Sequence, residues 1–432
     1  MRYGYSLPER LQKFKELTSD DRNAITKYDV KTVTGTELHK VYHVSIELPK
    51  YRLDNTRTLY LQEQYVYKEN KPEDFFSDVE SDLVQEIQHN ILTNLIKSSD
   101  KEKDLLSFFS SNEQTEPLIL THDGFVISGN RRLCAFRELI NGEDGKNYEK
   151  YKHFSLVRVV ILPNYDQDQI DQIEDFLEQQ TDIKEPFSWI SRAIGYRRRM
   201  QRFNYNHREL AQRSGQKEKE IESLIERLEI ADRYLDSINK HKDYNQILDD
   251  DYAFKQIYLC RQKERVSNSN KIAFEKLAFL AIKNKEKFSD RMYKNIPIIQ
   301  DAQHKIINEL EYEFEEELLS IKSEVDQNNQ LGEFNLFPDP VIPIIKLIEK
   351  PEYEKQVISI VSDKIEEHLA IEREKKKKSS VLEKIRKANT LLIEANQIKN
   401  NEMDKKGISD QLNNIENEIK KIRKWIDQDA LN

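Results

Sequence analysis

The sequence has few of the residues that interrupt regular structure. Only 10 glycines and 11 prolines occur in 432 residues, well below the roughly 7% and 5% found in average proteins. This scarcity predicts long helices and excludes a β-sandwich, a propeller or a low-complexity tail. The two cysteines, Cys134 and Cys260, are too few for a disulfide framework or a cysteine-rich zinc site.

The sequence shows neither the pattern of a signal peptide nor that of a membrane-spanning segment. The first residues lack an apolar core of signal-peptide length, and no window approaches the roughly eighteen apolar residues of a membrane span. We therefore expect a soluble, cytoplasmic protein without a membrane partner. Lys and Arg number 69 against 78 Asp and Glu, so the net charge is 69 − 78 = −9, which argues against a protein that coats nucleic acid.

The N-terminal part mixes strand and helix patterns. Residues 39–48 and 154–162 are rich in β-branched residues, as strands are, and the apolar runs around Asp123-Gly124 predict a β-hairpin. A four-residue repeat predicts an amphipathic helix through Val79, Leu83, Ile87, Ile91 and Leu95. Strands and helices in one small unit indicate an α+β domain over 39–165, preceded by a polar N-terminal extension, 1–38.

Beyond this domain the pattern is helical to the end of the chain. Residues 328–343 contain three prolines and a glycine and form the clearest linker. Farther on, apolar residues step by three and four, most strictly at Ile408, Leu412, Ile415, Ile419, Ile422 and Ile426. Such a stripe suits a coiled coil or a helical hairpin, and pairing within one chain or between two chains is equally compatible with it.

Residues 123–139 combine a hairpin strand, a glycine and the start of a helix. Gly129 lets the backbone approach a ligand closely, and the helix after it points its free N–H groups and positive dipole end outward. Arg131 and Arg132 stand in the first turn, where the dipole disfavours cations, so an anion such as phosphate opposite them would explain their position. A surface helix whose arginines pair with acidic side chains explains these residues equally well.

The element Gly129-Asn130-Arg131-Arg132, with Ala135 after it, resembles the G-E-R-R-x-x-A box of the ParB/sulfiredoxin superfamily. Residues 116–119 resemble the Q-P-L-x segment before the hairpin, and Glu178-Gln179 resembles the E-N pair that opens the linker into the helical half. The resemblance covers residues 40–235 and implies a ParB/sulfiredoxin-like fold for the α+β domain. ParB-like proteins bind a nucleotide, typically CTP with magnesium, and the nucleotide closes a dimeric clamp on DNA.

Carried over to this chain, the resemblance implies a site for a nucleoside triphosphate, with CTP favoured, and Mg²⁺. Its residues would be Gly129, Asn130, Arg131, Arg132, Glu116, Glu178 and Gln179, with Glu116 and Glu178 close to the metal through the nucleotide. The chain departs from the family at Asn130, where the box has glutamate, and at Asp182, where an arginine is expected. These departures put hydrolysis and cytosine selectivity in question. Sulfiredoxin chemistry is excluded, because its cysteine would stand at Asn130.

Residues 206–228 match the spacing of a helix-turn-helix. Ala211 is small where the two helices would cross, Gly215 permits the turn, and the anchor positions hold Leu210, Ile221 and Leu224. Residues 214–251 contain 6 Lys+Arg and 11 Asp+Glu, so phosphates would repel most of the second helix. Its residues that could reach DNA base edges are Lys217, Lys219 and Ser223.

The helix before this motif is strongly basic. Residues 192–213 contain seven arginines and one glutamate. We therefore expect Arg197, Arg198, Arg199 and Arg202 to neutralise the DNA backbone, with weak sequence readout. The alternative is a solvated helical face whose arginines pair with the acidic segment that follows.

Three functions are compatible with these features. The leading hypothesis is a ParB-like DNA-binding protein whose nucleotide site biases a homo-oligomeric, dimeric clamp. The second is a ParB-like nuclease or NTPase of a mobile-element or anti-phage defence system, with a metal on Glu113, Glu116 and Glu178. The third is an assembly adaptor that binds a protein partner through the acidic helix and residues 344–432.

The expected organisation is an extension (1–38), a ParB/sulfiredoxin-like domain (39–165), a helix-turn-helix region (166–235), a helical domain (236–330), a linker (331–343) and a C-terminal helical hairpin or coiled coil (344–432).

Overall fold

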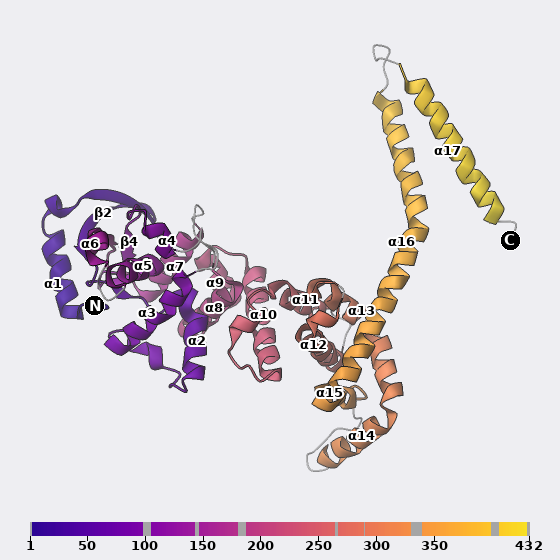
Figure 1. Ribbon diagram of the computed structural model, residues 1–432, viewed down its shortest axis with the longest axis horizontal. Coiled ribbons are helices and arrows are strands. Elements are labelled where there is room, and N and C mark those ends of the chain that lie inside the picture. Colours follow the sequence, from indigo (N-terminus) through magenta and orange to yellow (C-terminus); the bar gives the residue numbers. More distant parts are fainter. Residues whose placement is uncertain are drawn as a thin grey trace. The chain divides into compact units, whose positions relative to one another are not determined.

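The computed structural model divides the chain into two units, residues 1–362 and 363–432. The first unit holds a β-sheet and most of the helices, and the second holds the end of one long helix and the last helix (Figure 1). The residues that the structure describes are 2–97, 105–142, 147–179, 187–263, 267–288, 290–329, 339–398 and 406–429.

A mixed six-stranded sheet lies at the centre of the N-terminal part, with strand order β1-β2-β6-β4-β5-β3. Strand pairs β4–β6 and β3–β5 are parallel and the other pairs are antiparallel. The β4–β5 hairpin turns at Gly124, whose φ of +91° agrees with the prediction from Asp123-Gly124. The bounds are β1 (Thr26–Thr32), β2 (Gly35–Ser45), β3 (Lys50–Tyr51), β4 (Leu118–Leu120), β5 (Phe125–Ser128) and β6 (Leu156–Ile161).

Helices cover both faces of this sheet. Because successive strand residues point to opposite faces, Val159 and Val160 of β6 belong to two different cores. The larger core packs α3 (Asp82–Ile96), α4 (Leu105–Phe109) and α5 (Asn130–Asn141) on one face, and the smaller core packs α7 (Gln167–Gln179) on the other. The mixed α+β architecture expected for the N-terminal part, with helices after it, is confirmed.

Residues 2–38 belong to the part of the chain built around the sheet (residues 2–179, here the sheet unit) and do not form an extension. The segment contains α1 (Leu7–Thr18) and β1, and β1 pairs with β2 along its whole length. Phe14 is buried in the larger core, and the Arg10 side chain is completely buried. Arg10 donates hydrogen bonds to the backbone oxygen atoms of Asp123 and Tyr5 and to the carboxylate of Glu80. The polar composition of this segment predicted a solvent-exposed extension. Polar residues such as Arg10 are instead buried, because they have hydrogen-bond partners inside the protein.

The remaining described elements are helices. The expected helical domain does not end at residue 330, because α15 (Ile342–Glu349) packs on α12 (Asn268–Lys283) and α14 (Glu315–Asn329). The first turns of α16 (Glu354–Ile398) also bury Val357, Ile358 and Val361. Of the expected linker, 331–343, residues 331–338 lie outside the described residues and Ile342 already belongs to α15. The bounds are α2 (Leu59–Lys68), α6 (Tyr148–Tyr151), α8 (Trp189–Phe203), α9 (His207–Ser214), α10 (Glu218–Ser237), α11 (Asp251–Arg261), α12 (Asn268–Lys283), α13 (Met292–Glu313), α14 (Glu315–Asn329), α15 (Ile342–Glu349), α16 (Glu354–Ile398) and α17 (Ile408–Asp429).

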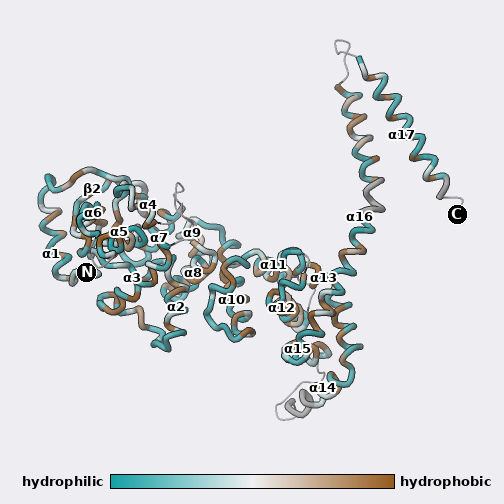
Figure 2. The backbone as a smooth tube through the Cα atoms, viewed as in Figure 1, coloured by the Kyte–Doolittle hydropathy of each residue, from teal (hydrophilic) through white to brown (hydrophobic). Residues whose placement is uncertain are grey.

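Hydrophobic residues recur at intervals along α16 and α17, between hydrophilic ones (Figure 2). None of the helices in the described part of the chain combines the length and the apolar character that crossing a membrane requires.

Candidate functional site

The corner at Gly129 joins β5 to α5. Gly129 is the N-cap of α5 with φ of +109°, so a left-handed backbone conformation is present where the sequence places glycine. Asn130 is buried, and its Nδ2 donates to the carbonyl of Val126 at 2.8 Å while its Oδ1 accepts from the backbone N–H of Arg52 at 3.3 Å. A carboxylate at this position would lack the N–H donor, so asparagine fastens the corner to β5 and to the segment after β3.

The two arginines of this corner bond to protein acceptors. Arg131 Nη2 donates to the carbonyl of Leu95 at 3.3 Å, and Arg132 Nη1 donates to the carbonyl of Glu116 at 2.8 Å. The same Arg132 nitrogen lies 3.5 Å from the Glu116 carboxylate. Burial lowers the pKa of Arg132, and Glu116 opposes this effect. An anion at this corner would have to share the two guanidinium groups with these protein acceptors.

Glu178 stands at the C-terminal end of α7, in different surroundings from Glu116. Its Oε1 accepts the backbone N–H of Phe187 at 2.7 Å, and its Oε2 lies 3.8 Å from Arg57 Nη2. The side chain of Gln179 lies outside the described residues. Within the described ranges, no group of three or more His, Cys, Asp or Glu side chains is arranged to hold a metal ion. Glu116 and Glu178, predicted to lie near one metal, therefore do not form a ligand set with a third such residue.

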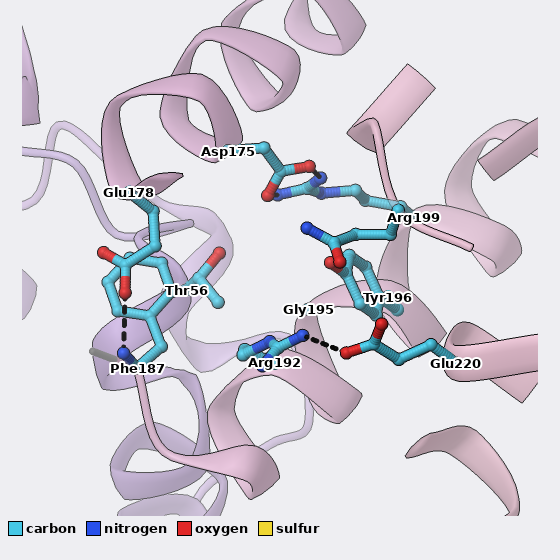
Figure 3. Close-up of a pocket in the computed structure, with 10 residues that line it drawn as sticks. Thr56, Asp175, Glu178, Phe187, Arg192, Gly195, Tyr196, Arg199 and Glu220 are labelled. Carbon is cyan, nitrogen blue, oxygen red and sulfur yellow. Dashed lines mark hydrogen bonds and ion pairs between the residues drawn. The ribbon is translucent and has the colours of Figure 1, made fainter. Parts of the chain in front are cut away.

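A pocket of about 260 Å³ lies beside Glu178, where α7 meets the 3₁₀ turn Thr56–Thr58, α8 and the start of α10 (Figure 3). Asp175 of α7 lies directly against Arg199 of α8, and Arg192 of α8 points toward Glu220 of α10. Gly195 allows α8 to approach the Thr56 turn, because a Cβ there would lie 3.1 Å from Thr56 Cγ2. The pocket is lined by Thr56, Asp175, Glu178, Phe187, Arg192, Gly195, Tyr196, Arg199, Gln216 and Glu220.

Two polar side chains of the pocket, Arg192 and Glu220, form an exposed ion pair that a ligand can replace. Arg192 Nη2 donates to Glu220 Oε1 at 3.3 Å, and the two side chains are 32% and 48% exposed. An ion pair as exposed as this contributes little free energy. Either side chain can therefore leave its partner and bind a group of a ligand instead. Burial raises the pKa of Tyr196 to about 12, so its hydroxyl stays protonated and can donate a hydrogen bond.

A buried ionic cluster lies behind this pocket and is formed by Arg52, Asp171, Glu174, Asp175 and Arg199. Arg52 pairs with Asp171 and with Glu174, whose Oε2 lies 3.1 Å from Arg52 Nη1. Arg199 Nη1 donates to Asp175 Oδ2 at 2.5 Å. Burial raises the pKa of Glu174 and of Asp175, and the guanidinium groups oppose it. The cluster joins α8 to α7 and to the segment after β3.

Arg197 and Arg199, both predicted to contact DNA, are engaged inside the protein. Arg199 is 6% exposed and belongs to the buried ionic cluster. Arg197 bonds to Asp232 at 2.8 Å and to Glu63 at 3.3 Å. Burial would lower the pKa of each arginine, but the adjacent carboxylates outweigh it and raise both pKa values. These two side chains hold helices together, so the prediction that they face the DNA backbone does not agree with their surroundings.

The other cations predicted to contact DNA are more accessible. Arg198 pairs with Glu63 and is 32% exposed, and Arg202 pairs with Asp54 and is 38% exposed. Lys217, the N-cap of α10, and Lys219 in its first turn are both exposed.

Helices α9 and α10 and the turn between them lie where the spacing predicts a helix-turn-helix. Asn206 caps α9, since its Oδ1 accepts the N–H of Glu209 and the Glu209 carboxylate accepts the N–H of Asn206, each at 2.9 Å. Gly215 ends α9 with φ of +68°, and the anchor residues Leu210, Ile221 and Leu224 are buried.

The outward residues of α10 are mostly acidic. Glu218 and Glu220 are exposed. Tyr258 of α11 has a pKa raised by burial and then by Glu222 and Glu226, so α11 lies near that part of α10. A DNA major groove would meet carboxylates and a neighbouring helix here.

Comparisons of the chain with protein-family models, with curated proteins and with solved structures found no match. Function is therefore inferred from the geometry of the residues themselves.

The spacing of acidic residues in the sequence indicates the buried ionic cluster, although a count of charges along the chain does not. Asp171, Glu174, Asp175 and Glu178 recur at i, i+3, i+4 and i+7, which places four carboxylates on one face of α7. An acidic stripe next to an arginine-rich helix indicates internal pairing. Arg52 has no such signal, because its position against α7 depends on the packing of the sheet.

Proposed function

We propose that this chain is a ParB-like DNA-binding protein in which a bound nucleotide biases the position of the helix-turn-helix within a dimer. The observation that carries the proposal is the composition of the pocket. Thr56 and Glu178 come from the sheet unit, whereas Gln216 and Glu220 come from the turn and second helix of the helix-turn-helix. A ligand there contacts both parts at once, so its affinity depends on their arrangement.

The chemistry of the pocket supports a nucleotide as the ligand. Arg192 offers a guanidinium at the mouth, the group best suited to phosphate. Glu178, Tyr196 and Gln216 offer acceptors and donors to a base and a sugar. Because about 260 Å³ is below the roughly 300–1,000 Å³ of usual small-molecule sites, the pocket suits the nucleoside, with the phosphates outside it. The proposed ligand is a nucleoside triphosphate, CTP by the resemblance, whose phosphates carry Mg²⁺.

Calorimetric titration of the full chain with each of the four NTPs and Mg²⁺ tests this proposal. We expect one NTP to bind, and Arg192→Ala to weaken its binding by about 10- to 100-fold, since hydrogen bonds to a charged group contribute about 1.5–3 kcal/mol. Arg198→Ala, on the same helix but outside the pocket, is the matched control and should bind normally.

Two outcomes would contradict it. If none of the four NTPs binds, the nucleotide proposal is wrong. Loss of binding in Arg131→Ala or Arg132→Ala, with Arg192→Ala unaffected, would move the site to the corner at Gly129.

We propose that DNA contact is made to the phosphate backbone by the accessible cations Arg198, Arg202, Lys217 and Lys219. The exposed glutamates of α10 favour weak sequence readout. Fluorescence anisotropy with labelled duplexes at several salt concentrations measures the number of phosphate contacts. We expect Lys217→Ala and Lys219→Ala each to lower the slope of log K against log salt by about one, equally for all sequences.

Lys27→Ala, in the exposed part of β1, is the control and should leave that slope unchanged. Duplex binding that is insensitive to both α10 lysines, or that is absent even at low salt, would show that this end of α10 does not contact DNA.

A second candidate function is assembly with protein partners. It is favoured by the acidic outward residues of α10 and by the exposed apolar side chains of α17. A stable oligomer that binds no DNA at any salt concentration would support this function over the first.

A further inference from the structure

The helices of residues 363–432 expose many large apolar side chains. Five of them on α17 are 42–53% exposed: Ile408, Leu412, Ile419, Trp425 and Ile426. Six on the last part of α16 are 37–67% exposed: Leu382, Ile385, Leu391, Leu392, Ile393 and Ile398. Apolar faces of this extent mark interaction surfaces.

The two helices present faces of different width. On α17 the apolar residues follow the three-and-four spacing strictly, and charged residues flank them. On α16 the line of Ile385 and Leu392 is widened on one flank by Leu391 and Ile398, which are seven residues apart. A strict single stripe is the narrow seam of a two-helix coiled coil, whereas a wider apolar face is typical of a helix that packs against a larger core. In the described part of residues 363–432, α17 is the one other helix available to α16.

We propose that a second copy of this chain supplies the missing helix, so that α16 and α17 of two copies form one four-helix core. The apolar positions of α17 support this number of helices. They are isoleucine at every step from residue 408 to residue 426 except Leu412, and in parallel coiled coils isoleucine at both core positions favours three or four helices over two. This inference concerns a different surface from the pocket and holds whether or not a nucleotide binds.

The charges beside the stripe favour an antiparallel pairing of the two α17 helices. With Ile419 of one copy beside Ile422 of the other, Glu416 of each copy lies opposite Arg423 of the other copy. The two-fold axis then makes this ion pair twice, and Glu418 keeps its own partner Lys421 at 2.7 Å. A parallel pairing would place Glu418 against Arg423 and leave Glu416 without a cation across the interface.

Sedimentation velocity of the full chain tests the assembly. We expect a dimer with twice the mass of the chain. Ile419→Glu should weaken the dimer by about a hundredfold or more, because it places a charge in the four-helix core. Lys420→Glu, the adjacent residue away from the stripe, is the matched control and should leave the dimer intact. A monomeric chain at about 10 μM, or a trimer, would overturn the proposal.

A charge exchange tests which residues meet. Arg423→Glu and Glu416→Arg should each weaken the dimer by about tenfold, since each turns two attractions into repulsions. An equimolar mixture of the two variants should regain the original affinity, because both ion pairs re-form in the mixed dimer, one with its original charges and one with the charges exchanged. Misfolded variants could not rescue each other in this way. Rescue of Arg423→Glu by Glu418→Arg, and not by Glu416→Arg, would overturn the antiparallel pairing.

Discussion

Replacing Arg199 by alanine is expected to destabilise the folded chain by about 3–5 kcal/mol, the usual cost of removing one partner of a buried ion pair. The Asp175 carboxylate would lose the guanidinium that lies 2.5 Å away. Asp171 and Glu174, also adjacent to Arg199, would keep only Arg52 as a buried counter-charge. Urea denaturation followed by far-UV circular dichroism measures the loss in the transition that includes the sheet unit.

Arg198→Ala is the control for this measurement. Arg198 is the preceding residue on α8, but it is about a third exposed and pairs with Glu63 at 3.3 Å. An accessible pair of this kind contributes about 0.2–1 kcal/mol, so the control should change stability little. Equal, small losses for Arg198→Ala and Arg199→Ala would show that water reaches the cluster and that it does not hold α8 in place.

The pH dependence of the Arg199→Ala variant has a defined sign. Burial raises the pKa of Asp175 and of Glu174, so these carboxyl groups take up protons more readily in the folded state than in the unfolded chain. Protonation then favours folding. Because alanine removes the cation that opposes this shift, we expect the stability deficit of Arg199→Ala to shrink as the pH falls from 7 toward 5.

The buried ionic cluster also bears on the proposed ligand response. Asp175 and Arg199 belong both to the cluster and to the wall of the pocket. A ligand bound beside them is therefore placed to stabilise or strain the contacts that fasten α8 to α7. This shared wall gives the pocket a direct physical connection to the helix that precedes the helix-turn-helix.

Local signals in the sequence predicted several elements of the fold. The Asp123-Gly124 hairpin, the strand now seen as β6 and the helix after Gly129 depend on neighbouring residues, and all three are present. The edge strand β1 was missed, because Val30 is its one fully buried apolar residue and Lys27 and Asp29 are exposed. A strand with one solvated face and a single apolar anchor lacks the alternation that identifies strands.

The four-residue repeat in α3 predicted the helix but not its buried face. Leu83, in that repeat, is 58% exposed, whereas Gln85, Gln88 and His89 are almost completely buried. The three polar side chains are buried because each has partners: Gln85 bonds to the backbone of Tyr51, Gln88 to Gln62 and Thr58, and His89 to the Tyr51 hydroxyl and to Glu138. Hydropathy alone cannot recognise a core built from satisfied polar groups.

The arginines of α8 illustrate the corresponding difficulty for the site. Their number predicted a surface for phosphates, but Arg197 pairs with Glu63, 134 residues away in the sequence. Whether a cation faces solvent or an internal carboxylate depends on the tertiary arrangement, and a charge count along the chain cannot show it. The box at Gly129 is similar, because the acceptors of Arg131 and Arg132 come from α3 and from the segment before β4.

Replacing Gly129 by alanine is expected to destabilise the chain by about 2–4 kcal/mol. The backbone at this residue has φ of +109°, a conformation that costs a residue with a side chain about 1–3 kcal/mol. The new Cβ would also lie 2.5 Å from Cδ2 of Leu118. Leu118 is completely buried in β4, between β5 and β6, so it cannot move away without disturbing the centre of the sheet, and overpacking adds its own cost.

Gly35→Ala separates the two causes. Gly35 begins β2 with φ of +127°, but nothing lies within 4 Å of a Cβ built there, so this variant carries the backbone strain without the clash. We expect it to cost about 1–2 kcal/mol in the same urea denaturation experiment, less than Gly129→Ala. A Gly129→Ala loss no larger than that of Gly35→Ala would mean that Leu118 yields, and that the corner before α5 tolerates a side chain.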